Sequence, residues 1–381
     1  MKNDTLSKVY DRIDSLIDSD YEFSLSDNIG LCVLFANKYK QSGDQKYYAV
    51  IKKSLNSLIN VKEYPTSDII TGSSGVLWLL KYLKKLEVID FSDSNIELLE
   101  NGTVHQFKTS LSIHNWDYHT GAIGHLLALD HPSCYKDFLD YLKMNIIKDK
   151  NGNYSLLSVK YNESTNLGLH AGILGVLSVM NCLIQKGCLV KESVEIRKKI
   201  LQIIFGKLQE TKNRYFPALY HRDYPCRMCW TYGELALSLQ LLGTSIVNND
   251  KALEQEALSI AINAMKRDTL KDTMIRDSCF ISGTSGNYLM FRLLDECFPS
   301  KGFEKAMDLW SDYTSGLLVR HDFFNIDRHT QNRKTDLSIL EGLCGICLSF
   351  ENFDYSWYEY ALLGVFTLDN RGTENLKSRV I

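Results

Sequence analysis

The sequence predicts an all-α protein built from repeated helical hairpins. Apolar side chains recur at helical spacing through most of the chain, as in residues 77–83 and 235–242. Only 5 prolines occur among the 381 residues, so proline interrupts few of these helices. A pair of glycines, three positions apart, opens one apolar helix after another, and recurrence of this kind is typical of a repeat protein.

The glycine pairs define the repeat. Five copies are complete: Gly72 with Gly75, Gly121 with Gly124, Gly172 with Gly175, Gly283 with Gly286, and Gly342 with Gly345. Two weaker copies complete a set of seven, one keeping only Gly30 and the other reading Gly233-Glu-Leu-Ala236. The second positions of successive copies are 45, 49, 51, 61, 50 and 59 residues apart. Each interval is long enough for two helices and a connection.

Seven such hairpins, laid side by side, can close into a ring. The glycines let each helix N-terminus approach its neighbours closely, because glycine has no Cβ. We therefore expect the glycine-marked helices to line the inside of the ring, and their N-terminal loops to gather around a common pocket at one end.

Three connections interrupt the helical pattern. Residues 151–155 form a turn-rich tip, residues 213–225 are irregular and suggest short strands, and residues 322–336 form a polar excursion. None has the composition of a domain linker. We therefore predict a single domain that spans residues 1–381.

Composition excludes some classes of function. The chain has 43 Lys and Arg against 46 Asp and Glu, a net charge of -3, so it lacks the broad basic field that a nucleic-acid backbone attracts. Neither an apolar signal core at the start nor a run of about 20 apolar residues is present in the sequence. We expect a cytoplasmic protein, whose 10 cysteines are reduced thiols.

Equivalent positions in the repeats bring chemically reactive side chains to one level. Two places before the first glycine, the third to sixth copies hold His119, His170, Thr231 and Ile281. Four places before that glycine, they hold Asp117, Gly168, Cys229 and Cys279. Two histidines, two cysteines and a carboxylate are thus candidates for one end of the pocket.

Each of these residues also has a purely structural interpretation. Cys229 and Cys279 suit zinc, whose preferred ligands are thiolates and imidazoles, but they can equally pack as small core residues. Asp117 is either a helix N-cap or an acid in the pocket. His119 and His170 are either satisfied core histidines or proton-transfer groups.

Two residues expected near the pocket also have both a structural and a functional interpretation. Arg227 is either an ion-paired arginine or a substrate clamp. Tyr232, directly before Gly233, belongs either to the core or to the pocket wall.

The pattern resembles the lanthionine synthetase C-like proteins, which include the cyclases of lanthipeptide biosynthesis. The matching segments are Trp116-Asp117 with its glycine pair, Asn166-Leu-Gly168 with its glycine pair, Arg227 with Trp230 and Tyr232-Gly233, Ser285-Gly286, and Gly342-Leu343 with Gly345. The resemblance covers nearly the whole chain. It implies an α/α toroid, a barrel of two concentric helix layers, and a pocket that contains Asp117, Arg227, Trp230 and Tyr232.

The resemblance also shows what has changed. Usual family members hold a zinc ion through one cysteine of a Trp-Cys-Tyr-Gly motif and through the cysteine and histidine of a Cys-His-Gly motif. The corresponding positions here are Thr231, Ile281 and Ser282. The usual Ala-His-Gly motif reads His170-Ala-Gly172, so the histidine has moved by one place.

Three hypotheses follow. In the first, the chain is a zinc-independent cyclase that adds cysteine thiols of a dehydrated precursor peptide to dehydroalanine or dehydrobutyrine. His119 or His170 is then the base, Asp117 the orienting group or the acid, and Arg227 stabilises the enolate. In the second, it is non-catalytic and binds a precursor peptide or a lanthipeptide dehydratase. In the third, zinc occupies a displaced site formed by Cys229, Cys279 and a histidine; both cysteines stand two places before the usual ligand positions, about 6 to 7 Å along an extended chain.

Overall fold

The computed structural model describes residues 3–90, 93–157, 164–212, 215–326, 332–353 and 355–366. Within these ranges the chain is helical apart from two short two-stranded ribbons. It divides into two compact units, one made of residues 1–99, 227–230 and 267–353, the other of residues 100–226, 231–266 and 354–381. The single domain predicted for residues 1–381 therefore stays a prediction.

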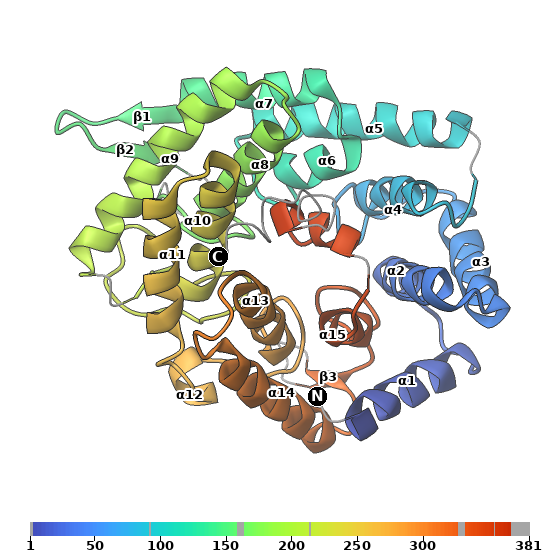
Figure 1. Cartoon of the computed structure of the whole chain (residues 1–381). Helices are drawn as coiled ribbons and strands as arrows, with labels where there is room; N and C mark the ends of the chain where they lie inside the picture. Colours follow the sequence, from blue (N-terminus) through green and yellow to red (C-terminus); the bar gives the residue numbers. More distant parts are fainter. Residues whose placement is uncertain are drawn as a thin grey trace. The chain divides into compact units, whose positions relative to one another are not determined.

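The first unit is an arc of four glycine-marked helices. These helices are α13 (Thr284–Cys297), α15 (Leu343–Phe350), α2 (Leu25–Ser42) and α4 (Ser73–Lys85), and each packs on the next in this order. Outer helices cover three of them: α14 (Phe303–Arg320) packs on α13, α1 (Asn3–Ile17) on α15, and α3 (Gln45–Ile59) on α2. The short α12 (Leu270–Thr273) and a ribbon of β3 (Asn325–Ile326) and β4 (Arg333–Lys334) complete this unit (Figure 1).

The second unit repeats the arrangement with three helices. Here α6 (Ala122–Leu129) packs on α8 (Ile173–Gln185), and α8 packs on α10 (Glu234–Asn248). Their outer partners are α7 (Pro132–Asn145), α9 (Val190–Glu210) and α11 (Lys251–Ala264). Two 3-10 turns, η2 (Tyr355–Glu359) and η3 (Gly364–Phe366), end the described chain, and η3 packs on α8 and α10. Helix α5 (Asp93–Ser112) begins in the first unit and ends in the second.

The sequence explains this layering. The seven glycine-marked helices are apolar on most faces, as α10 illustrates with buried residues from Glu234 to Ser245. An outer helix such as α3 has instead one buried stripe, formed by Val50, Ile51, Leu55 and Leu58, and a charged outer face. The predicted helical hairpins are confirmed where an inner helix packs on its outer partner.

The glycines allow close contacts of two kinds, one with the helix's own loop and one with a neighbouring element, as the sequence predicts for the second. A Cβ on Gly75, Gly286 or Gly345 would overlap the carbonyl oxygen of a residue in the loop just before the same helix, Ile69, Phe280 or Ile339. In these three copies the close approach is between the helix and its own loop. In α2, by contrast, a Cβ on Gly30 would overlap the carbonyl oxygen of Leu337, in the loop before the neighbouring α15.

The connections follow the predictions in part. The tip at residues 151–155 lies in a hairpin of β1 (Ile146–Lys148) and β2 (Tyr154–Leu156). In residues 215–225 the structure has one isolated bridge, between Leu219 and Asn166, rather than the expected strands; residues 213–214 lie outside the described ranges. The excursion at 322–336 carries β3 and β4, and its residues 327–331 also lie outside those ranges.

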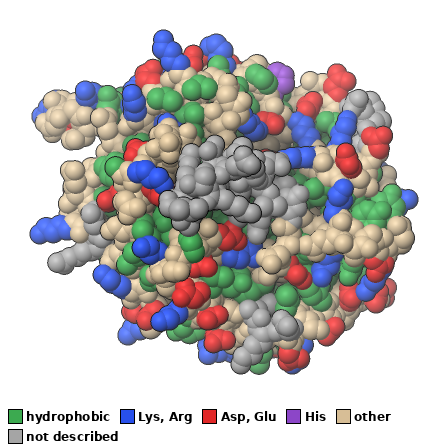
Figure 2. Space-filling view, viewed as in Figure 1, with side chains coloured by type: hydrophobic (Ala, Val, Ile, Leu, Met, Phe, Trp, Pro, Cys, Tyr) green, Lys and Arg blue, Asp and Glu red, His purple; other side chains and the backbone are tan. Residues whose placement is uncertain are grey.

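Basic and acidic side chains are interspersed on the face that Figure 2 shows. None of the helices in the described ranges is both long and apolar enough to cross a membrane.

Candidate functional site

The loops before the glycine-marked helices share one backbone turn. In five of them the carbonyl of the residue six places before the first glycine accepts a hydrogen bond from the residue that follows this glycine. The acceptors are Thr66, Asn115, Asn166, Asp277 and Asp336, and the donors are Ser73, Ala122, Ile173, Thr284 and Leu343, at 2.9 to 3.1 Å. This bond closes each loop onto the first turn of its helix.

The side chain six places before the glycine reinforces the turn. Asn166 Oδ1 accepts a hydrogen bond from the Gly168 amide at 2.8 Å. Asp277 and Asp336 do the same for the amides of Cys279 and Ser338, at 3.1 and 2.9 Å. A short side chain with an oxygen is therefore part of the scaffold at this position. We did not predict this role, although the Asn and Asp residues at a constant offset are its signal in the sequence.

Neighbouring loops of the second unit are joined through their backbones. The Tyr118 amide donates to the His170 carbonyl, and the Leu169 amide donates to the Thr231 carbonyl, both at 2.9 Å. These bonds hold three successive loops at matching levels.

The two histidines lie together as a result. The ring centroids of His119 and His170 are 5.6 Å apart, with an angle of 60° between the ring planes. Both side chains are half-buried, so each keeps a surface that a substrate can reach. An edge contact with Tyr118, at 5.8 Å between ring centroids, helps to orient His170. Tyr118 is itself buried and donates a hydrogen bond to the Tyr360 carbonyl at 2.8 Å.

Asp117 has a structural role in the loop that carries His119. Its side chain is 4% exposed, and Oδ1 accepts a hydrogen bond from the Thr120 amide at 2.7 Å. Asp68, at the same offset in the first unit, accepts from the Thr71 amide at 2.6 Å. The carboxylate therefore serves a turn that the scaffold uses elsewhere without histidines. The role of Asp117 as an acid stays a prediction.

Tyr232 borders the loop of His170. A Cβ on Gly168 would overlap the Tyr232 ring, which explains why this position is glycine when its counterparts carry side chains. Asn166 Nδ2 lies 3.5 Å from the Tyr232 hydroxyl. Tyr232 is half-buried, and its place in a pocket wall stays a prediction.

In the first unit, Trp230 and Arg227 differ in exposure. Trp230 is fully buried and packs on Phe280, with 5.7 Å between the ring centroids. It therefore packs in the core under its loop. We expected Trp230 to contact substrate, but its buried side chain offers no surface for such a contact. Arg227 is half-buried. The Met228 backbone between them is held by hydrogen bonds with Thr273 and Asn287, both at 3.1 Å.

The cysteines proposed for a displaced zinc site are buried. Cys229 is 0% and Cys279 4% exposed, and Cys279 Sγ lies 3.7 Å from Ser282 Oγ. No cluster of three or more His, Cys, Asp or Glu that could hold a metal is found in the described ranges.

The residues at the three usual zinc positions do not fit a zinc ion. Ile281 has no donor atom, and the neutral hydroxyls of Thr231 and Ser282 are poor substitutes for thiolate and imidazole ligands. This conclusion follows from the chemistry of the three side chains alone.

The comparison with known protein families settles the assignment. The family model described as lanthionine synthetase C-like protein matches residues 19–359. The chain belongs to this family.

The lanthionine synthetase C-like fold is also found by structural comparison. The structure of nisin cyclase has a TM-score of 0.69 to this chain, with 19% sequence identity, and the match covers 96% of this chain and 98% of nisin cyclase. This likeness confirms the predicted all-α fold class, the α/α toroid. No curated protein sequence matches the chain at a significant level.

Proposed function

We infer that this lanthionine synthetase C-like protein is a cyclase that forms thioether rings in a dehydrated, cysteine-containing precursor peptide without the usual zinc ligands. The observation that carries this proposal is the pair of half-buried histidines, His119 and His170, held 5.6 Å apart by hydrogen-bonded loops. Family membership indicates the class of reaction. The two histidines can remove and return the protons that this reaction transfers.

The proposed reaction needs no metal to balance. One imidazole takes the proton of a peptide cysteine thiol, whose ordinary pKa of about 8.5 already leaves some thiolate at neutral pH. The sulfur forms a bond to the β-carbon of dehydroalanine or dehydrobutyrine, and the π electrons of the double bond move into an enolate. A proton returned to the α-carbon completes the addition. Nothing is oxidised or reduced.

The histidines suit both proton steps. Imidazole accepts and donates protons near neutral pH more readily than any other side chain. One ring can act as base while its neighbour returns the proton, with Asp117 as an alternative acid. Arg227 stays a candidate for stabilising the enolate on the basis of the family resemblance alone.

The central experiment measures ring formation directly. A dehydrated peptide with one free cysteine is incubated with the protein, and loss of free thiol at unchanged mass is followed with time. We expect acceleration over the protein-free reaction, and a loss of about 100-fold or more in His170→Ala if that ring is the base. Asp68→Asn is the control for a substitution in a loop of this type, because Asp68 makes the same type of turn as Asp117 in a loop without histidines. Its rate should equal that of the wild type.

Metal dependence is tested in the same assay. Exhaustive treatment with a chelator should leave the rate unchanged, since the zinc positions hold Thr231, Ile281 and Ser282. A rate that falls on chelation and returns with zinc would contradict the metal-free mechanism.

The altered donor set also favours a second candidate, a non-catalytic protein that binds the precursor peptide or a dehydratase. Tight binding of the dehydrated peptide, measured by calorimetry, without any acceleration of thiol loss would favour this candidate over the cyclase.

A further inference from the structure

An open pocket lies in the first unit, between the short helix α12 and the end of the outer helix α14, both of which are labelled in Figure 1. Its lining comes from residues 270–276 and 317–321, and its volume is about 510 Å³. This volume is within the range of small-molecule sites. His119 and His170 belong to the other unit, so the pocket is separate from the proposed proton-transfer groups.

Hydrogen bonds fix the backbone on both sides of the pocket. The Ile275 amide donates to the Leu270 carbonyl at 3.0 Å, which closes the turn at the end of α12. The Tyr313 hydroxyl, on α14, donates to the Asp268 carbonyl at 3.2 Å. Because this bond ties α14 to the segment just before α12, the two walls are held together before any ligand enters.

The base of the pocket is apolar. Ile275 and Leu317 are each 3% exposed and belong to the core beneath it, whereas Met274 is 46% exposed. A methionine side chain is unbranched and polarisable, so it adapts to apolar groups of different shape. The base therefore offers a surface to an alkyl or aromatic group.

Three cations border this base: Lys271, Arg276 and Arg320. All three side chains are exposed, and the lining, all of which lies in the described ranges, includes no Asp or Glu. None of the three forms an ion pair with a carboxylate of the part of the chain that the structure describes. The Asp322 carboxylate, just beyond the lining, lies 4.0 Å from Arg333 Nη1 instead. The pocket therefore has an excess of positive charge.

His321, the remaining ionisable residue of the lining, responds to this positive charge. Burial lowers the pKa of His321, and the charges of Arg320 and Arg333 lower it further, whereas Asp277 raises it. The imidazole is therefore neutral at neutral pH. The positive charge of the lining comes from its lysine and its two arginines.

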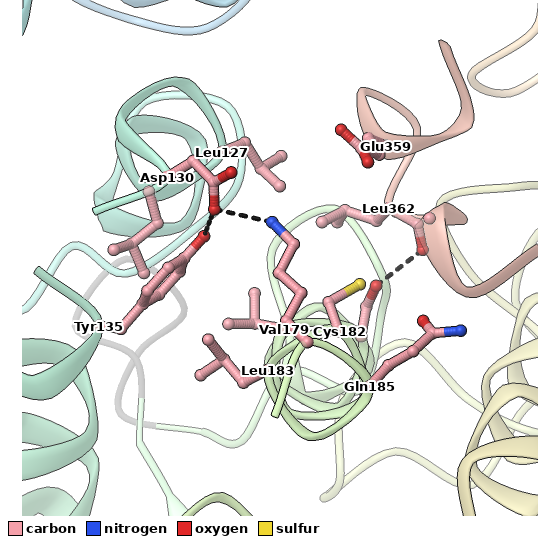
Figure 3. Close-up of a pocket in the computed structure, with 13 residues that line it drawn as sticks. Leu127, Asp130, Tyr135, Val179, Cys182, Leu183, Gln185, Glu359 and Leu362 are labelled. Atoms are coloured by element: carbon pink, nitrogen blue, oxygen red, sulfur yellow. Dashed lines mark hydrogen bonds and ion pairs between the residues drawn. The ribbon is translucent and has the colours of Figure 1, made fainter. Parts of the chain in front are cut away.

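The pocket bordered by α6, α8 and η2, in the second unit, provides a contrast. There the Asp130 carboxylate accepts hydrogen bonds from Lys186 Nζ at 2.7 Å and from the Tyr135 hydroxyl at 2.5 Å (Figure 3). The lysine of that pocket is thus already paired within the protein, and it indicates no charged ligand. The cations beside α12 lack such a partner and favour an anion.

We propose that the pocket beside α12 binds a phosphate monoester with an apolar body. The phosphate lies among Lys271, Arg276 and Arg320, and the body lies on the apolar base. A phosphate monoester carries nearly two negative charges at neutral pH, because its second pKa is about 6. It therefore offsets three cations better than a carboxylate does, and its oxygens match the planar fork of an arginine.

The size of the pocket lets the three cations act on one ligand. Its dimensions are comparable to the Debye length, about 8 Å at physiological ionic strength, so salt screens the cations from a shared anion only in part. The long side chains of lysine and arginine also keep their charged ends mobile above an apolar stem. This proposal is independent of the cyclase activity.

Calorimetry at constant ionic strength with three simple probes tests the chemistry. Phenyl phosphate has the dianion and the apolar body, phenyl sulfate has the same shape with one negative charge, and inorganic phosphate lacks the body. We expect phenyl phosphate to bind. Phenyl sulfate should bind at least about fivefold more weakly because of its smaller charge, and inorganic phosphate at least about fivefold more weakly because it buries no apolar surface.

A fourth probe distinguishes two sources of the phosphate group. N-acetyl-Gly-phosphotyrosine-Gly amide carries the same phenyl phosphate on a short peptide. Binding as tight as that of phenyl phosphate supports the site with a phosphorylated side chain as its ligand. Binding of phenyl phosphate alone supports it with a small free ester as its ligand.

Four variants locate the binding site. Arg276→Gln and Arg320→Gln should each weaken the binding of phenyl phosphate about fivefold. Lys305→Gln is the matched control, because Lys305 is an exposed cation on the same helix as Arg320, about 22 Å away along the helix axis; it should bind as the wild type does. Met274→Ser should weaken the binding of phenyl phosphate but not that of inorganic phosphate. Thermal unfolding of each variant reports whether the unit remains folded.

Three results would overturn the proposal. These are no binding of phenyl phosphate to the wild type, binding of phenyl sulfate as tight as that of phenyl phosphate, or an effect of Lys305→Gln as large as that of Arg320→Gln. The histidine variant His170→Ala should bind phenyl phosphate as the wild type does, so loss of cyclase activity and loss of this site are distinguishable.

Discussion

The loop that leads into α8 and the loop that leads into α10 occupy equivalent places in their repeats but are built differently. The first begins with Asn166, whose side-chain oxygen caps the turn, and ends with Gly172 at an extended φ of -140°. The second begins with Arg227, whose side chain has no acceptor atom, and ends with Gly233 at a φ of 94°. Glycines that open the other inner helices have φ values between -102° and -140°.

This difference distinguishes residues that stabilise the loops from a residue that is a candidate for function. Where Asn or Asp stands six places before the glycine, the residue maintains the turn. The Arg227 side chain cannot accept this hydrogen bond, and Gly233, six residues later, has a positive φ that L-residues rarely adopt. A position that breaks a local rule of its own fold is a candidate for function, which singles out Arg227 for mutation.

The largest effect should come from Gly172→Ala. The added Cβ would overlap Asn166 Oδ1 and lie 2.5 Å from the Gly168 amide nitrogen, so the turn must open at a cost of about 3 kcal/mol. Gly187→Ala is the control, because Gly187 has a φ of 71° but no atom within 4 Å of the new Cβ; it should cost about 1 kcal/mol. Urea unfolding of both variants measures the difference, and equal losses would contradict the clash.

Removing the hydrogen-bond acceptor Asn166 from the loop that leads into α8 should have the next largest effect. Asn166→Leu leaves the buried Gly168 amide without its partner and should lower the free energy of unfolding by about 2 kcal/mol. Asn166→Asp restores an acceptor of the kind found at Asp277 and Asp336, and should recover most of this loss. If both variants unfold at the same denaturant concentration, the side-chain hydrogen bond is not what stabilises the loop.

In the loop from Arg227 to Gly233, substitution of the first residue should affect the reaction rate more than the stability. Arg227→Met should slow thiol addition about tenfold if the guanidinium stabilises the enolate. It should lower the free energy of unfolding less than Asn166→Leu does, because the Arg227 side chain has no acceptor to lose from its turn. Arg227→Lys, which keeps the charge, should recover part of the rate. A large loss of stability in Arg227→Met with an unchanged rate per folded molecule would remove the distinction between the two loops.

The smallest effects concern the two equivalent aspartates. Asp117→Asn and Asp68→Asn both keep the carbonyl oxygen that accepts the Thr120 or Thr71 amide, so each should cost less than about 1 kcal/mol in unfolding. Only Asp117→Asn should slow the reaction if its carboxyl group donates a proton. Equal rates for the two variants would assign Asp117 to the turn alone.

The sequence was sufficient for the helices and their order in the repeats. Apolar periodicity and the glycine offsets locate every inner helix, and the shared offset of His119 and His170 anticipates their contact. It could not decide the burial of Trp230 or Cys229, because both residue types are common in cores and in sites. Nor could it reveal the ion pair between Asp130 and Lys186, since these residues stand far apart in the chain and meet only after α6 and α8 have packed.

The joining of the loops by backbone hydrogen bonds has a consequence for the evolution of the family. The bonds from Tyr118 to His170 and from Leu169 to Thr231 involve only main-chain atoms, so the side chains at the level of His170 and Thr231 can be exchanged without moving the loops. Replacement of a metal ligand by Thr231 would then leave the geometry of its neighbours intact. Such an architecture allows the chemistry of a site to diverge while its fold stays recognisable.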